Sequence, residues 1–164
     1  MDKLTRELLD MLRATLDGQQ RLLRIAVGRQ EAMRTYDIER LNGLAEQERT
    51  ELERAGDWER RRKDLVARFK AQFGPQFTPT ASEIARRCEE PGKTQILMVA
   101  AEIKKTVELI EQHTRINAKV SETVVKGLAK VLKVMTGMAQ HAGLYLRNGR
   151  KASPRGIHLL EITA

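Results

Sequence analysis

A 4-3 repeat of apolar residues in the second half of the chain limits most strongly what this chain can fold into. Twelve of the fifteen repeat positions are apolar. Side chains at this spacing form one stripe along an α-helix, and that stripe packs against another helix in a coiled-coil seam. We therefore predict a helix over residues 94–146. The repeat positions are Ile96, Ala100, Ile103, Val107, Ile110, Thr114, Asn117, Ser121, Val124, Leu128, Val131, Met135, Met138, Ala142 and Tyr145.

The first seventy residues also show helical periodicity. No proline occurs from Lys3 to Phe73, and apolar residues recur every three or four positions. A helix over residues 3–73 would be about 105 Å long at ~1.5 Å per residue, which is typical of a coiled coil rather than of a globular core. Gly43 and Gly56 interrupt the pattern, so a bend at either glycine stays open.

A short connection separates the two long periodic segments. Gly74-Pro75 ends the first, and Pro91-Gly92 precedes the second. Between them, Thr80 and Ser82 are N-cap candidates, and Thr80 with Glu83 three residues later resembles a capping box, which predicts a short helix over residues 82–88. Because the connection is short, the long helices should run antiparallel. The predicted fold class is all-α, a long antiparallel two-helix hairpin with a short helix in the connection.

The composition changes after Leu146. Asn148-Gly149 is a strong turn signal, and Ser153-Pro154 cannot continue a helix. We therefore predict a helical domain over residues 1–146 and a non-helical tail over residues 147–164, either flexible or weakly β-structured.

Composition and charge limit where the protein works. Cys88 is the only cysteine, which fits a reducing compartment, and the first residues do not resemble a signal peptide. The longest nearly uncharged apolar run, residues 134–146, is shorter than the roughly 20 residues of a membrane span. We expect a soluble, cytoplasmic protein without membrane insertion.

The net charge of +8 is compatible with nucleic acid, an acidic protein or an acidic membrane surface as a partner. The basic residues are interspersed with 22 acidic ones, so no nucleic acid is expected.

The sequence contains no pattern of catalytic residues. His113 and His141 would lie about 42 Å apart on one helix, no histidine–cysteine cluster has metal-ligand spacing, and Ser121 has no histidine three or four residues away. We therefore expect no enzyme activity, no metal and no cofactor, and interpret the chain as a binding protein.

A partner surface is predicted at the open end of the hairpin, where residues 4–23 should meet residues 131–146. Both segments carry more apolar residues than one seam uses, and methionines suit a groove that accommodates a helix. Self-association, or cover by the short helix or the tail, is the alternative. Asn117 in mid-seam is expected to fix the register of the helices, unless it faces solvent.

Several local sequences resemble the FlgN family of flagellar type III export chaperones. Asp37, within residues 32–41, looks like the family's midhelix motif, and Asn117 looks like the asparagine of its second long helix. Leu144-Tyr145, Asn148-Gly149 and Arg155-Gly156 look like its C-terminal ending, although Leu146 replaces the glycine that usually follows the tyrosine.

The resemblance implies a chaperone that binds the C-terminal helices of hook–filament junction proteins, prevents their premature assembly and delivers them to the type III export gate. It implies a contact of Tyr145 with the export gate; the alternative is that Tyr145 is an aromatic residue of the helix seam.

The particular client and the oligomeric state stay open. The alternative functions are a structural coiled-coil adaptor unrelated to flagella and a basic helical nucleic-acid-binding protein. The predicted client-binding residues are Val131, Val134, Met135, Met138, Ala142, Leu144 and Leu146.

Overall fold

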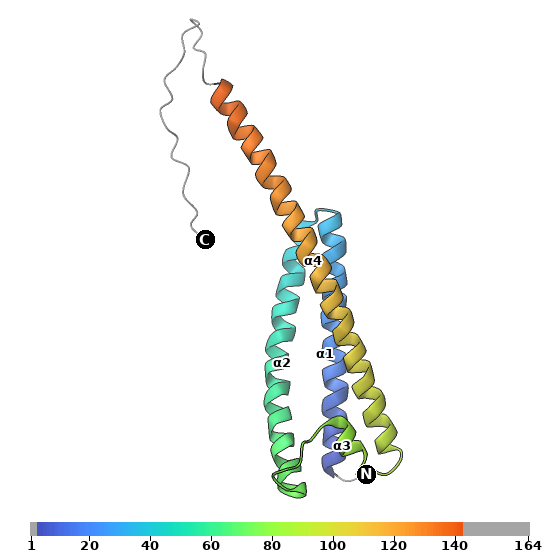
Figure 1. The fold of residues 1–164 in the computed structure, drawn as a ribbon. Helices are drawn as coiled ribbons and strands as arrows, with labels where there is room; N and C mark the ends of the chain where they lie inside the picture. Colours follow the sequence, from blue (N-terminus) through green and yellow to red (C-terminus); the bar gives the residue numbers. More distant parts are fainter. Residues whose placement is uncertain (1–2, 143–164) are drawn as a thin grey trace, which may run out of the picture. The chain divides into compact units, whose positions relative to one another are not determined.

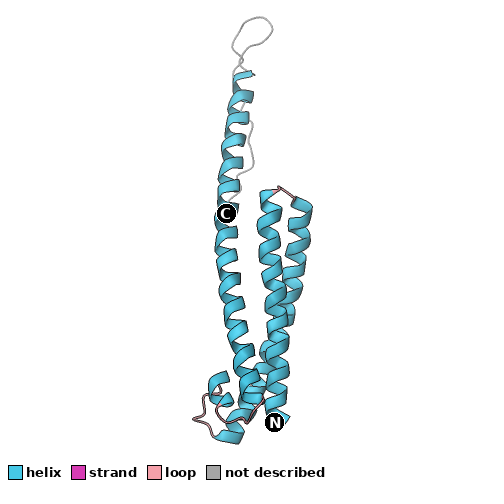
Figure 2. Ribbon diagram, turned by 90° about the vertical axis from the view of Figure 1, so that its right-hand side faces the viewer, coloured by secondary structure: helices cyan, strands magenta, loops and turns pink. Residues whose placement is uncertain are grey.

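The computed structural model describes residues 3–142 of the chain, with side chains up to Gly137. Its described part contains four helices and no strand (Figures 1 and 2). The prediction of an all-helical protein, with long helices that pack together and a short helix in the connection, is confirmed. The tail predicted over residues 147–164 lies outside the described residues. The helices are α1 (Lys3–Arg34), α2 (Ile38–Phe73), α3 (Ala81–Ala85) and α4 (Gly92–Ala142).

Backbone contacts divide the chain into two units, Met1–Ser121 and Glu122–Ala164. The first unit contains α1, α2, α3 and the first thirty residues of α4. The described part of the second unit is the remainder of α4, which is helical to Ala142.

The prediction of one helix over residues 3–73 is wrong, because the chain reverses direction at residues 35–37. The break lies at neither Gly43 nor Gly56. Tyr36 has a left-handed φ of 55°, and the N–H groups of Tyr36 and Asp37 donate to the carbonyls of Met33 and Ala32 at 3.4 and 2.9 Å. This pair of bonds is the Schellman motif that ends many helices, usually with glycine at the left-handed position.

The residue after the reversal starts the next helix. The Asp37 carboxylate accepts a hydrogen bond of 2.9 Å from the backbone N–H of Arg40, which satisfies one of the free donors at the start of α2. One short segment thus ends α1 and caps α2.

Helices α1 and α2 consequently form an antiparallel pair. Glu7 near the start of α1 pairs with Arg68 near the end of α2, and the hydrogen bond from Arg68 lowers the pKa of the Glu7 carboxyl. Halfway along the pair, the buried carboxylate of Glu51 lies 2.8 Å from Arg21 and 2.7 Å from Arg54. Two of these ion pairs, Glu7–Arg68 and Arg21–Glu51, join α1 to α2, and Arg54 adds a second cation to Glu51 from within α2.

Helix α4 runs parallel to α1 within the first unit. Thr5 Oγ1 lies 3.5 Å from Cys88 Sγ, just before α4. Further along both helices, Gln30 Oε1 lies 3.0 Å from His113 Nδ1. The start of α1 therefore meets the start of α4, and the prediction that it meets the end of α4 is wrong. The reversal at residues 35–37 explains the difference, because it returns the chain to the α1 start before α4 begins.

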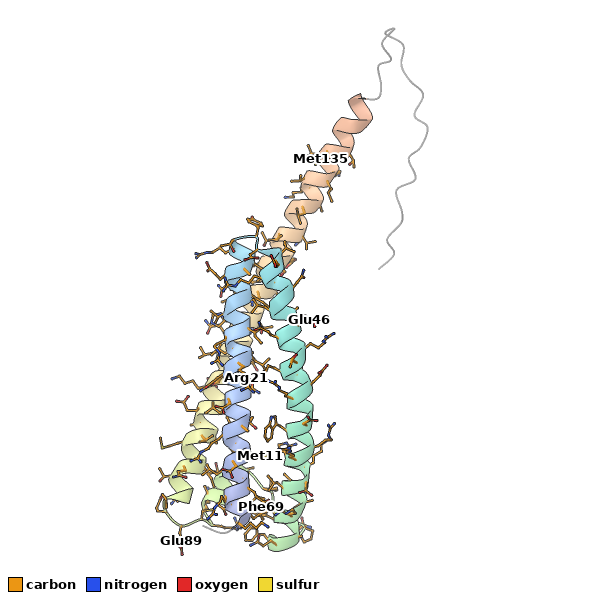
Figure 3. The ribbon with its side chains drawn as sticks, turned by 180° about the vertical axis from the view of Figure 1, so that it is seen from behind. Met11, Arg21, Glu46, Phe69, Glu89 and Met135 are labelled. Atoms are coloured by element: carbon orange, nitrogen blue, oxygen red, sulfur yellow. The ribbon has the colours of Figure 1, made fainter. Side chains whose placement is uncertain are left out.

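An apolar core gathers at this end of the unit. Leu9, Phe69 and Ile96, from three different helices, are each 2% exposed or less. Figure 3 shows Met11 and Phe69 toward this end of α1 and α2. The core thus joins all four helices. Its members are Leu4, Leu8, Leu9, Met11, Leu65, Phe69, Phe77, Ile84, Ala85 and Ile96.

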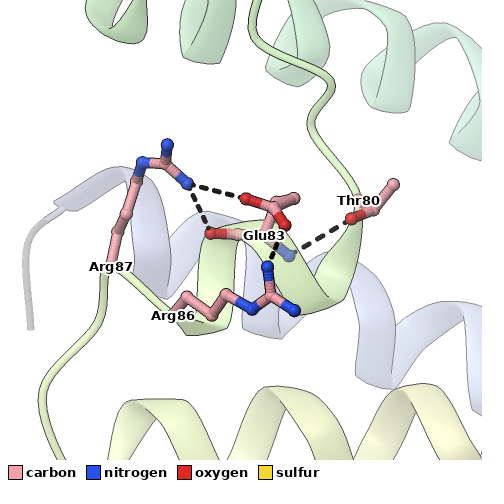
Figure 4. A network of polar contacts seen from close by, with 4 residues as sticks. All are labelled: Thr80, Glu83, Arg86 and Arg87. Atoms are coloured by element: carbon pink, nitrogen blue, oxygen red, sulfur yellow. Dashed lines mark hydrogen bonds and ion pairs between the residues drawn. The ribbon is translucent and has the colours of Figure 1, made fainter.

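The connection between α2 and α4 is held by caps and cation–π contacts. Thr80 Oγ1 accepts from the backbone N–H of Glu83 at 3.2 Å (Figure 4), so Thr80 is the candidate that caps the short helix, which ends at Ala85 and not at residue 88 as predicted. The Glu83 carboxylate pairs with Arg86 and Arg87. The Arg87 guanidinium also lies 4.6 Å from the ring centre of Phe77. These contacts fix the connection against the core.

We predict that Tyr36→Gly stabilises the protein. A left-handed conformation costs an L-residue about 1–2 kcal/mol and glycine almost nothing, so the free energy of unfolding should rise by about 1 kcal/mol in urea denaturation. Tyr36→Phe is the control, because it keeps the backbone strain and should change little. A loss of stability in Tyr36→Gly would contradict this account of the reversal.

A second prediction concerns the core. Phe69→Ala should lower the free energy of unfolding by about 3–5 kcal/mol, because the ring is 2% exposed. Phe73→Ala, one turn later and 40% exposed, is the matched control and should cost about 1 kcal/mol. Phe69→Leu, with about 1.5 kcal/mol expected, gives a measurable value if the alanine variant does not fold. Equal losses for Phe69→Ala and Phe73→Ala would refute the core assignment.

Candidate protein-binding surface

One face of the second unit's helix is apolar and exposed. Val125, Leu128, Val131, Leu132 and Met135 recur at helical spacing, and we call these five residues the apolar stripe. Each is between 55% and 64% exposed, and Figure 3 labels Met135 on this part of α4. Val134, 56% exposed, lies beside the stripe. An uncovered apolar stripe on an amphipathic helix usually marks an interaction surface.

Local interactions support this helix only weakly. Lys126 Nζ lies 2.6 Å from the Glu122 carboxylate one turn earlier, and such a pair contributes about 0.3–0.5 kcal/mol. Gly127 and Gly137 each lower the stability of the helix by about 1 kcal/mol relative to alanine. No atom lies within 4 Å of the position that a Cβ would occupy at either glycine, so packing does not require glycine there. Most helical stability in proteins comes from packing of an apolar face, so a partner on the stripe would stabilise this helix.

The opposite face of the same helix is basic. Lys126, Lys130 and Lys133 lie within about 60° of one another around the helix at ~100° per residue. Glu122 is the one acidic residue between positions 122 and 137. The described part of the second unit therefore combines an apolar half with a positively charged half.

The predicted client-binding residues lie partly within and partly outside the described residues, and their role stays a prediction. Val131, Val134 and Met135 are all exposed on α4. Met138 and Ala142 belong to α4, but their side chains lie outside the described residues. Leu144, Leu146 and the predicted gate contact Tyr145 lie outside the described residues altogether.

Three exposed stripe residues were not among the predicted client-binding residues. Leu132 lies within the predicted surface over residues 131–146 but was not named as a client contact. Leu128 was interpreted as part of the seam, and Val125 belonged to neither group. Their exposed fractions are 59% and 64%. The signal that could have identified them is the amphipathic pattern itself, which continues unchanged from Val131 back to Val125.

The prediction that residues 4–23 contribute to the open surface is wrong for their most apolar part. Leu4, Leu8, Leu9 and Met11 are buried in the core, together with Ile96 from the start of α4. They are therefore part of the scaffold of the first unit.

Asn117 contacts α1 inside the first unit. Its Nδ2 donates a 2.8 Å hydrogen bond to the backbone carbonyl of Ala26, and the residue is half-buried. This contact is compatible with a role in setting the register between α1 and α4, which stays a prediction.

Among the described residues, no three His, Cys, Asp or Glu side chains converge in a way that could hold a metal ion. A cavity of about 250 Å³ between α1 and α2, which the sequence did not suggest, is lined by small residues such as Gly18 and Ala55 and by the Arg21–Glu51 pair. In residues 3–142, no helix is both long enough and apolar enough to cross a membrane.

Comparison with known proteins identifies the family. A family model described as FlgN protein matches residues 1–153 of the 164-residue chain. No curated protein and no solved structure matches the chain. Since the family model covers more than nine tenths of the sequence, the chain belongs to the FlgN family of flagellar export chaperones.

Proposed function

We propose that this chaperone binds the C-terminal helical segments of hook–filament junction proteins through the apolar stripe and the residues that follow it. The observation that supports the proposal most directly is the exposure of the stripe, between 55% and 64% for each member. A soluble protein rarely leaves such a face uncovered unless a partner occupies it.

The mechanism requires no covalent step. A client helix that assembles into a filament carries an apolar face, and this face would aggregate or polymerise if it were free in solution. An amphipathic helix can lay that face against another apolar stripe at i, i+3, i+4 and i+7 positions. Val, Leu and Met side chains adapt to different helix surfaces, methionine most readily. The bound client stays unassembled until it is released.

Delivery to the export gate is the second part of the proposal. Tyr145 is the proposed gate contact, and it follows the stripe by ten residues. The support for this role is the resemblance of Leu144-Tyr145 to the family's ending. Because the client must leave the chaperone at the gate, we expect a moderate affinity rather than a picomolar one. A picomolar complex that the gate does not dissociate would contradict this expectation.

The stripe is tested with two methionines on the same helix. Met135 and Met98 are 61% and 64% exposed, respectively. Met135→Asp should weaken binding of hook–filament junction proteins from the same genome by at least about tenfold, since it places a charge in an apolar contact. Met98→Asp should bind like the wild type. Isothermal titration calorimetry measures both affinities, and equal affinities for the two variants would refute the proposed site.

A further inference from the structure

The helix that carries the apolar stripe has a second property that client binding does not require. Its basic face, formed by Lys126, Lys130 and Lys133, lies on the other side of the helix from Leu128. A basic amphipathic helix of this kind is typical of segments that lie in the surface of a membrane.

The residues that flank the stripe argue against charge recognition of a partner helix. In a helix pair, the positions beside the seam carry the charges that select the partner. Beside this stripe lie Ala129 and Thr136 on one edge and Gly127 and Val134 on the other, all uncharged. Around the helix, the lysines lie at least about 80° from every member of the stripe, beyond the positions that flank a helix seam.

A bilayer fits both faces at once. When such a helix lies in the interface, its apolar half enters the boundary between headgroups and acyl chains, and its polar half stays in the aqueous headgroup layer. There the negative potential of anionic lipids attracts lysines within about one Debye length, ~8 Å at physiological salt. No described residue forms an ion pair with Lys130 or Lys133, so their charges are available to such a surface.

The basic run on α2 lacks this combination. In the run from Arg60 to Lys63 on α2, Arg60 pairs with Asp57 and Arg62 pairs with Glu59. The guanidinium of Arg61 lies over the half-buried Trp58 ring, 4.7 Å from its centre. Two of the four charges there are in ion pairs, and among the described residues of α2 no exposed apolar stripe accompanies them.

We infer that residues 122–137 of α4 bind an anionic membrane surface, with the apolar stripe in the lipid interface and the lysines toward the headgroups. A helix held in this way lies on the membrane and does not span it. Since the proposed function places the client on the same stripe, client and membrane compete for this helix. This second step rests on the proposed function. An anionic membrane next to the export gate would then weaken the binding of the client to the chaperone.

The first experiment measures co-flotation of the full chain with lipid vesicles. Vesicles of equimolar phosphatidylcholine and phosphatidylglycerol should capture the protein, and pure phosphatidylcholine vesicles should not. Replacing Lys126, Lys130 and Lys133 with glutamine should weaken capture by at least about tenfold, since each lysine near an anionic surface contributes about fivefold. Leu132→Asp should also reduce capture, because it interrupts the stripe.

A matched control uses three other lysines on the same helix. Lys93, Lys104 and Lys105 are exposed on the first part of α4, and their replacement with glutamine lowers the net charge by the same amount. This variant should bind anionic vesicles like the wild type. Equal losses in the two triple variants, or equal capture by the two kinds of vesicle, would overturn the inference.

A second experiment separates the membrane inference from the proposed function. Anionic vesicles should displace a bound hook–filament junction protein from the chain, and neutral vesicles should not. Client binding without vesicle binding would refute the membrane inference and leave the proposed function intact. Vesicle binding without client binding would refute the proposed function and leave the membrane inference intact. If both bind and the vesicles displace no client, the shared stripe is refuted.

Discussion

The hydrogen-bonded reversal at residues 35–37 is the constraint on which the rest of the structure depends. Two backbone bonds to Ala32 and Met33 end α1, and the Asp37 carboxylate starts α2. The first seventy residues therefore form an antiparallel pair instead of one rod. Because the chain returns to its starting end, the apolar residues at the start of α1 meet Phe69 and Ile96 in one core.

This arrangement divides one sequence repeat into two parts with different environments. In the first unit the repeat is buried at Ile96 and half-buried at Ile103 and Ile110, where α1 lies alongside α4. Ser121, the last residue of that unit, donates to Met33 Sδ at 3.2 Å, and α1 ends one residue after Met33. In the second unit the repeat is half-buried at Val124 and exposed at Leu128, Val131 and Met135. A single apolar pattern thus supplies both an internal seam and the proposed binding surface.

Much of this structure could be predicted from the sequence, and the failures have physical causes. Periodicity predicted the long helices, and Thr80 with Glu83 predicted the cap of α3. The reversal was missed because Tyr36 occupies a left-handed position where glycine would be the usual signal. Periodicity shows which face of a helix is apolar but not which element covers it, so Leu128 was interpreted as a seam residue and residues 4–23 as part of the binding surface.

The central claim is that the apolar stripe is uncovered in the free chaperone and covered by its client. Hydrogen–deuterium exchange of residues 122–137 tests it most directly, because exchange reports how readily each segment opens. We expect rapid exchange of this segment in the free chain, slow exchange around Phe69 and Ile96, and strong protection of the segment after a hook–filament junction protein is added. Full protection of residues 122–137 in the free chain, unchanged by the client, would contradict the account.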